Sequence, residues 1–456
     1  MEFDLRFSDK EITAWGGMGL MKRMLDHLGF DSAFAAAGMP EPGSNRGYRP
    51  EQLITQFILS VWCGANRFEH TEVTRHDPVL KRLFGFKRMA NCKAVMRLFN
   101  KFGQGTNESV MDSLYRWMFG QLSIDGITLD LDSTVMTRYG AQQGAQRGYN
   151  PTKRGRASHH PLMAFVADTR MIANCWLRPG NTASAHNSQA FLANTRHRLG
   201  GKKVALLRAD SGFSDSAFLD HLDEQQLHHI VALRLTQPLQ RSLVNATGWW
   251  VLQDEHGRAV EGIELTRFRY QAEAWSIPRW VVGIRQHIAQ RAEPKGKSLN
   301  LFADDPVIGQ WRYSALVTDL DLPAVVIWRT YRGRADCENR IKELKYDFAA
   351  DSFNMRDFWA TEAALNTVML AYNLMSLFKQ VLLKSSAVKH SSNTVQHQLQ
   401  TLRYKLFAKA GYITTESRKP ILNMVVAMQA RAWIEGLWDA AKTFDLPAEF
   451  KPVYSP

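Results

Sequence analysis

Apolar residues recur at helical spacing from Leu20 to about Phe119, and no strand-like run interrupts them. Leu53 and Phe57, four residues apart, would lie on one face of a helix. We therefore predict an all-helical N-terminal domain over residues 1–120. A basic row on the stretch from Cys92 to Phe102 (Lys93, Arg97 and Lys101) fits either a DNA-recognition helix or a solvated helix face.

The hydrophobic period changes from helical to alternating after Gly126. Ile127, Leu129 and Leu131 are separated by polar residues, which is typical of a strand with one buried face. Further strands are predicted at 161–168, 171–177, 203–210 and 229–235, with a crossover helix at 184–199 and a short helix at 213–222. A strand-rich run with a crossover helix predicts a mixed sheet flanked by helices.

Short alternating runs then fill residues 237–310, separated by Gly and Pro, and predict a β-rich insertion. On this interpretation residues 121–236 and 311–355 form the two parts of one α/β domain, and residues 356–456 are a helical C-terminal region. Charged and amide residues interrupt the apolar stretch from Phe358 to Leu383, which predicts a core helix and no membrane span.

The chain of 456 residues has 57 Lys and Arg against 44 Asp and Glu, a net charge of +13. Such an excess favours a polyanionic partner, although solubility alone is the plainer explanation. Four isolated cysteines indicate buried thiols in a reducing compartment rather than a zinc site, and no signal peptide is evident.

The segment YRGRADCENRIKELK, residues 331–345, carries the most specific pattern. On an ideal helix Arg334, Glu338 and Lys345 fall within about 40° of one another, on one polar face. The adjacent stripe is apolar and consists of Cys337, Ile341, Leu344 and Phe348. Taken alone, the polar face is a row of surface salt bridges.

The spacing of Tyr331, Arg334, Glu338 and Lys345 resembles the Y-R-E-K signature of bacterial insertion-sequence transposases of the DDE class. The segment GYNPTKRGRASHHP after the first strand and TLRYKLFAKAG near the C-terminus resemble the same group. The resemblance implies an RNase H-like catalytic domain of the α/β (α+β) class, in which Glu338 is the third catalytic carboxylate. It also implies an aspartate within the first strand and another at the end of the strand that follows the crossover helix.

Both aspartates are present. Asp132, followed by Ser-Thr, is the preferred first carboxylate, and Asp130, which points to the same face of the strand, remains an alternative. Asp210 ends the run VALLRAD, so the second position is filled, unless Asp210 only caps the following helix.

The resemblance implies that Asp132, Asp210 and Glu338 bind two Mg²⁺ or Mn²⁺ ions, because hard oxygen ligands suit these metals. Tyr331 and the two cations of the signature, Arg334 and Lys345, would contact the DNA backbone. The implied partner is double-stranded DNA, as terminal inverted repeats and as target, bound by a homodimer in a cytoplasmic, nucleoid-associated location. The alternatives are an RNase H-like nuclease or resolvase without strand transfer and a non-catalytic, domesticated DNA-binding protein.

The stretch from Arg138 to His160 has no acidic residue and several glycines. Lys153, Arg154 and Arg156 make it a candidate loop for the DNA backbone, with a solvated hairpin tip as the alternative. His159 and His160 are weaker candidates for metal ligation. In the insertion, one of the tryptophans at 249, 250, 275 and 280 would stack on an extruded base, or these residues form the core of a small sheet.

Overall fold

The computed structural model describes residues 3–454 except residues 8, 45, 255, 289–309 and 385–395. Its N-terminal part is helical, as predicted from the apolar spacing. The helices are α1 (Met18–His27), α2 (Phe30–Ala36), α3 (Pro50–Trp62), α4 (Thr71–Arg75), α5 (Pro78–Leu83), α6 (Cys92–Phe99) and α7 (Gln104–Gly120).

Capping residues define where these helices begin. The Asp77 carboxylate accepts a hydrogen bond from the amide of Leu80 and starts α5, and the Asn91 side chain accepts one from Ala94 and starts α6. Pro50 occupies the first turn of α3, where its missing N–H costs nothing.

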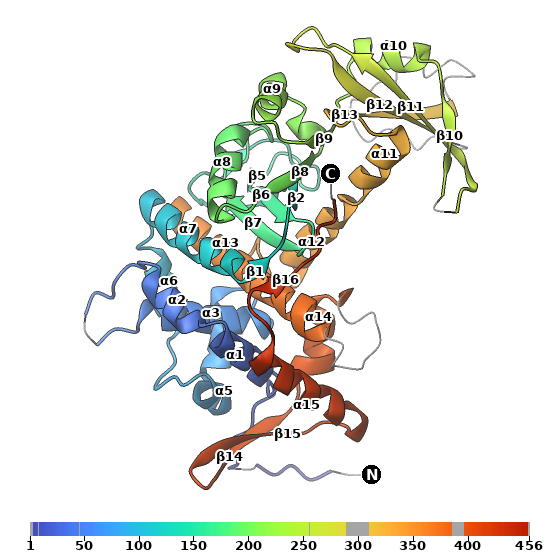
Figure 1. The fold of residues 1–456 in the computed structure, drawn as a ribbon. Helices are drawn as coiled ribbons and strands as arrows, with labels where there is room; N and C mark the ends of the chain where they lie inside the picture. Colours follow the sequence, from blue (N-terminus) through green and yellow to red (C-terminus); the bar gives the residue numbers. More distant parts are fainter. Residues whose placement is uncertain are drawn as a thin grey trace.

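A nine-stranded sheet runs from the middle of the molecule out into the projecting part that carries α10 (Figure 1), in the order β10-β11-β12-β13-β9-β8-β2-β6-β7. Its strands are β2 (Ile127–Ser133), β6 (Leu162–Val166), β7 (Met171–Trp176), β8 (Val204–Ala209), β9 (His229–Ala232), β10 (Trp250–Gln253), β11 (Ala259–Tyr270), β12 (Arg279–His287) and β13 (Trp311–Thr318).

The strand directions agree with the expected RNase H-like arrangement. Strands β2, β6 and β7 are antiparallel neighbours, whereas β8 and β9 run parallel to β2. Helix α8 (Ser188–Arg198) makes the crossover from β7 to β8, and α9 (Ser216–Glu224) connects β8 to β9. A large mixed sheet flanked by helices confirms the predicted fold class.

The predicted insertion is built onto the same sheet. After α10 (Gln237–Asn245), strands β10 to β12 pair in antiparallel fashion, and β13 joins them to β9 through Leu316↔Ala232 and Thr318↔Ile230. The insertion therefore extends the central sheet instead of forming one of its own, and in Figure 1 it projects away from the N-terminal helices. The proposed domain boundaries remain predictions.

Helix α13 (Phe358–Leu377) lies between the N-terminal helices and the sheet, in orange in Figure 1, and continues as a π-helix, Phe378–Leu383. Every residue from Ala360 to Leu377 is buried, as the predicted core helix requires. Within the described ranges, no helix has the length and apolar character needed to cross a membrane.

The C-terminal region is less helical than predicted. Besides α14 (Leu399–Leu402), a π-helix (Arg403–Phe407) and α15 (Met428–Thr443), it contains the hairpin of β14 (Gly411–Glu416) and β15 (Lys419–Met424). Ser417 and Arg418 both have positive φ, 46° and 67°, as a two-residue hairpin turn demands. The turn lacks the Asn-Gly or Asp-Gly that usually marks it, which is why the pattern of the sequence did not indicate it. The last strand, β16 (Ala448–Glu449), pairs with β1 (Leu122–Ser123).

Candidate active site

Asp132 and Asp210 lie at the ends of neighbouring parallel strands. Strands β2 and β8 are in register up to the pair Leu131↔Ala209, so the next residue on each strand is an aspartate. Adjacent strands are about 4.8 Å apart, which brings the two carboxylates close together on one face. Their proximity is felt electrostatically, because the charge of Asp210 contributes to a raised pKa of Asp132.

Asp130, the alternative first carboxylate, is engaged elsewhere. It is fully buried, and both of its oxygens accept hydrogen bonds from Arg208, at 2.6 Å from Nε and 2.9 Å from Nη2. A carboxylate held in a bidentate buried ion pair is not available to a ligand without leaving the arginine uncompensated. This arrangement favours Asp132 over Asp130.

The Asp132 carboxylate is almost buried and has an unusual acidity. Burial raises the pKa of Asp132 to about 6, Arg334 acts in the opposite direction, and Asp210 raises it further. The Nη2 atom of Arg334 lies 3.1 Å from Asp132 Oδ2 and donates to the carbonyl of Leu131, also at 3.1 Å. The Nε atom of Arg334 has no hydrogen-bond partner in the described part of the chain.

Arg334 stands at a break between two helices, α11 (Ala324–Arg332) and α12 (Ala335–Tyr346). The break is at Gly333, where a side-chain Cβ would come within 2.8 Å of Arg208 Nη1. That nitrogen donates to the carbonyl of Thr330 at 2.6 Å. Glycine thus allows the Arg208–Asp130 pair to pack directly beneath the start of α12.

Helix α12 presents the predicted polar face toward the end of β2. Arg334 reaches Leu131 and Asp132, and about three turns later Lys345 Nζ donates to the carbonyl of Val135 at 2.9 Å. Glu338, between them on the helix, is exposed and makes no hydrogen bond or ion pair with any described residue. On the other stripe Cys337, Leu344 and Phe348 are buried and Ile341 is half-buried.

Tyr331 lies near the same carboxylates. It is half-buried, and burial raises the pKa of its hydroxyl. Arg334 lowers this pKa, whereas Asp210 and Asp132 raise it. Asp132, Asp210 and Glu338 nevertheless do not form a metal site: within the described ranges, no three His, Cys, Asp or Glu side chains are placed to hold an ion. The structure therefore brings Asp132 and Asp210 together and leaves Glu338 outside their immediate contact.

The basic stretch after β2 is more ordered than a plain loop. Short strands β3 (Met136–Thr137), β4 (Gln146–Arg147) and β5 (Ala157–His159) form a small sheet, and Lys153, Arg154 and Arg156 are exposed at its tip. His159 has a structural role, because its Nδ1 accepts from Arg138 Nε at 2.9 Å, and burial lowers the pKa of its ring to about 4.

Comparison with protein families decides the class. Residues 2–441 match the family described as Transposase DDE domain group 1. The chain belongs to this DDE transposase family. No curated protein matches the chain. Among solved structures, the piggyBac transposase synaptic complex with hairpin DNA matches at 12% identity and a TM-score of 0.44, covering 87% of this chain and 82% of that chain. The family assignment rests on the family match alone.

Membership of the DDE family implies a divalent metal, and the carboxylate chemistry of the candidate donors suits one, but Glu338 would have to approach the other two acids. Asp132 and Asp210 repel each other, so a cation between them would relieve the repulsion, and Glu338 is free of protein partners among the described residues. Arg334 already occupies one oxygen of Asp132. Metal binding by both oxygens of Asp132 would therefore require Arg334 to move.

The insertion tryptophans of this DDE family member differ in exposure. Trp249 packs against Arg285, Trp280 against Arg267 and Arg269, and Trp275 is buried. Trp250 is 55% exposed and is the most exposed of the four. Base stacking by a tryptophan remains a prediction.

Sequence reasoning missed two groups beside the carboxylates. The first is Arg208, which pairs with Asp130. Its position in the middle of the apolar run of β8 could have indicated a buried ion pair, because an unpaired charge is not tolerated there. Ser184, whose Oγ lies 2.9 Å from Ser133 Oγ, follows β7 in a segment without any recognisable pattern.

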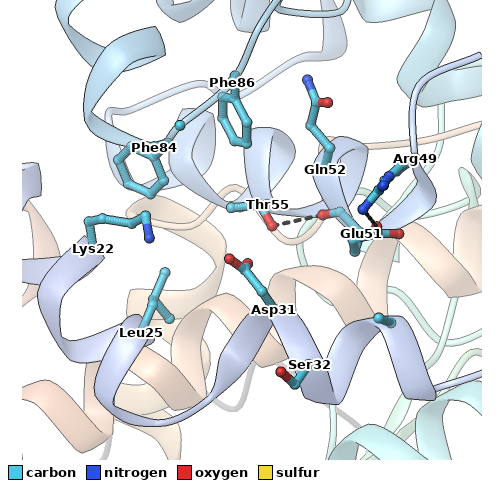
Figure 2. A pocket seen from close by; sticks show the side chains of 12 residues that line it. Lys22, Leu25, Asp31, Ser32, Arg49, Glu51, Gln52, Thr55, Phe84 and Phe86 are labelled. Carbon is cyan, nitrogen blue, oxygen red and sulfur yellow. Dashed lines mark hydrogen bonds and ion pairs between the residues drawn. The ribbon is translucent and has the colours of Figure 1, made fainter.

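A hollow of about 350 Å³ lies elsewhere, between α1, α2 and α3 (Figure 2). Lys22, Asp31 and Arg49 are among the residues that line it, and Arg49 is 3.9 Å from Glu51. None of the candidate catalytic or DNA-binding residues contributes to it.

Proposed function

We propose that the protein is the transposase of a bacterial insertion sequence of the Y-R-E-K branch, which cuts DNA at the element's terminal inverted repeats and joins the freed ends to target DNA. The observation that carries the proposal is the position of Asp132 and Asp210, each directly after the register pair Leu131↔Ala209 of two parallel strands, next to the helix that bears Glu338. The family match supports the same reaction class.

In this proposal Asp132, Asp210 and Glu338 hold Mg²⁺ or Mn²⁺, as two ions, which stabilise the charge at phosphorus and activate the attacking oxygen when bound. Arg334, Lys345 and Tyr331 bind the DNA backbone near the scissile phosphate. The unpaired Nε of Arg334 supports this role, because a phosphate oxygen can accept a hydrogen bond from it and compete with Asp132 for the guanidinium.

The exposed cations Lys153, Arg154 and Arg156 would bind the duplex beyond the cleavage point, since nothing in the described structure neutralises them by an ion pair. Transposition joins two ends, so the working form would be a homodimer on DNA, located in the cytoplasm at the nucleoid. The helical N-terminal domain would supply further DNA contacts.

The deciding experiment uses duplexes that carry the terminal repeat, identified as imperfect inverted repeats in the DNA that flanks the gene. With Mg²⁺ the protein should nick these duplexes and transfer the 3′ ends to a plasmid target, and Asp132→Asn should do neither. Nicking without joining would identify a nuclease or resolvase. Binding without metal-dependent nicking would identify a non-catalytic DNA-binding protein.

A further inference from the structure

His160 is held rigidly at the entrance of β6. Its amide donates to the carbonyl of Arg178 at 2.9 Å, and Arg178 Nε donates back to the carbonyl of His160 at 3.1 Å. Only 9% of the residue is exposed. The backbone on both sides of the ring is therefore fixed, and the side chain has a defined position.

That position adjoins the candidate carboxylates. Strands β2 and β6 pair through Ser133↔Leu162, and the amide of Thr134 donates to the carbonyl of Pro161 at 3.2 Å. His160 thus lies beside the backbone that directly follows Asp132. Three charged groups are near enough to act on the pKa of the ring: Arg178 and Lys345 lower it, and Asp210 raises it.

A hydrogen bond determines the tautomer of the ring. Nδ1 lies 2.8 Å from the carbonyl of Thr182, and because a carbonyl can only accept, Nδ1 carries the proton. Burial lowers the pKa of His160, which favours the neutral ring, and in the neutral ring with the proton on Nδ1 the Nε2 atom has a free lone pair. Nε2 accepts no hydrogen bond from any described residue.

The segment that contains Thr182 is itself anchored to both aspartate strands. Arg178 Nη1 donates to the carbonyls of Ala183 and Ser184, and Ser184 Oγ lies 2.9 Å from Ser133 Oγ, next to Asp132. On the other side a Cβ at Gly212 would meet both Ser184 Oγ, at 2.8 Å, and Asp210 Oδ1, at 2.9 Å. His160 is therefore fastened to the rim of the site by the same segment that spans its two aspartates.

We propose that His160 is a further catalytic residue, whose Nε2 accepts a hydrogen bond from the attacking hydroxyl, of water or of a DNA 3′ end, and orients its lone pair toward phosphorus. The proposal rests on the proposed function. The carboxylates are committed to metal and Arg334 and Lys345 are donors, so the nucleophile's O–H needs an acceptor that these groups do not offer. A phosphate oxygen cannot form a hydrogen bond with Nε2 of the neutral ring, because neither atom carries a proton.

Three variants separate the two nitrogens of the ring. In His160→Asn the amide nitrogen takes the place of Nδ1 and keeps the bond to Thr182, but nothing replaces Nε2. His160→Gln places its terminal amide near Nε2 and can supply an acceptor oxygen there. His160→Ala removes both. Single-turnover nicking of a terminal-repeat duplex with Mg²⁺ should slow by about 10- to 100-fold in His160→Asn, as expected for a lost hydrogen bond to a group developing charge, and recover partly in His160→Gln.

DNA affinity and the melting temperature should be unchanged in His160→Asn, and His186→Asn, an exposed histidine of the same segment, should nick like the wild type. A wild-type rate in His160→Asn with a slow His160→Ala would make the residue a structural anchor and overturn the proposal. Loss of stability in both Asn and Gln variants would do the same. Asp132→Asn is run alongside: if it still nicks, the proposed function itself fails, whereas an inactive Asp132→Asn beside a fully active His160→Asn rejects only the role of His160.

Discussion

Arg334 caps Asp132: its Nη2 is 3.1 Å from Oδ2, and both side chains are nearly inaccessible to solvent. In the DNA-free protein the first candidate metal ligand is thus neutralised by the residue proposed to bind the scissile phosphate. Since one guanidinium cannot serve both partners fully, phosphate binding and metal binding at Asp132 are expected to assist each other.

The carboxylate variants Asp132→Asn, Asp210→Asn and Glu338→Gln should each abolish nicking and strand transfer. The substitutions keep side-chain size but remove the charge that holds the metal, so the loss falls on the chemical step. Gel-shift binding to the terminal repeat should stay the same or tighten, because one carboxylate fewer repels the phosphates. Full activity in Glu338→Gln would show that the third ligand is another residue.

Asp130→Asn should behave differently and destabilise the fold. The substitution leaves Arg208 buried without its charged partner, which costs about 3–5 kcal/mol in comparable buried pairs. Thermal or urea unfolding measures this loss, and the folded fraction should retain nicking activity at low temperature. A stable but catalytically inactive Asp130→Asn, paired with an active Asp132→Asn, would reverse the assignment of the first ligand.

Arg334→Gln and Lys345→Gln should weaken binding to the terminal repeat and flatten its salt dependence. Each lost phosphate contact makes the negative slope of log K against log salt shallower by about 0.9. Lys342→Gln is the matched control, because Lys342 is an exposed cation on the same helix with no partner among the described residues. If the slope of all three variants equals that of the wild type, Arg334 and Lys345 only make structural contacts with β2.

Glu362 gives a pH-dependent stability. Burial raises the pKa of this α13 carboxyl to about 7, while its bond from the Leu177 amide and the charge of Arg198 oppose the shift and Glu108 adds to it. The folded state therefore holds the proton more tightly than the unfolded chain, and this group's contribution to stability falls as pH rises from 4.5 to 7. Glu362→Gln should be more stable than the wild type at pH 8, by about 3 kcal/mol, and equal to it near pH 4. Urea unfolding at the two pH values checks the sign, and a constant difference would contradict it.

Local patterns were enough to predict most strands of the sheet and the buried stripe of α12. Alternation from Ile127 to Leu131 marks β2 as a strand, and Cys337 and Leu344 recur at helical spacing, so each signal lies within one element. The single buried face expected for β2 was wrong, because every residue from Ile127 to Asp132 is buried. The position of Asp210 at a strand end followed from the same reasoning. What the residues of one element cannot reveal is which other element they meet.

Long-range partners account for the rest. Nothing near Asp130 in the sequence shows that Arg208 neutralises it, and nothing near Leu316 shows that β13 pairs with β9 and so attaches the insertion to the sheet. The hairpin turn at Ser417 and Arg418 was missed for a local reason, because neither residue favours positive φ. The catalytic assignments of Asp132, Asp210 and Glu338 remain predictions that mutagenesis must test.

The attachment of the insertion through β13 has a mechanical consequence. Backbone hydrogen bonds run without a gap from β11 through β13 and β9 to β8, the strand that ends at Asp210. A pull on the insertion, such as a bent duplex would exert, is borne by this stiff ladder and not by a loose connecting peptide. The insertion and the Asp210 carboxylate are therefore mechanically coupled, and strain applied at the outer strands reaches the strand that ends at the carboxylate.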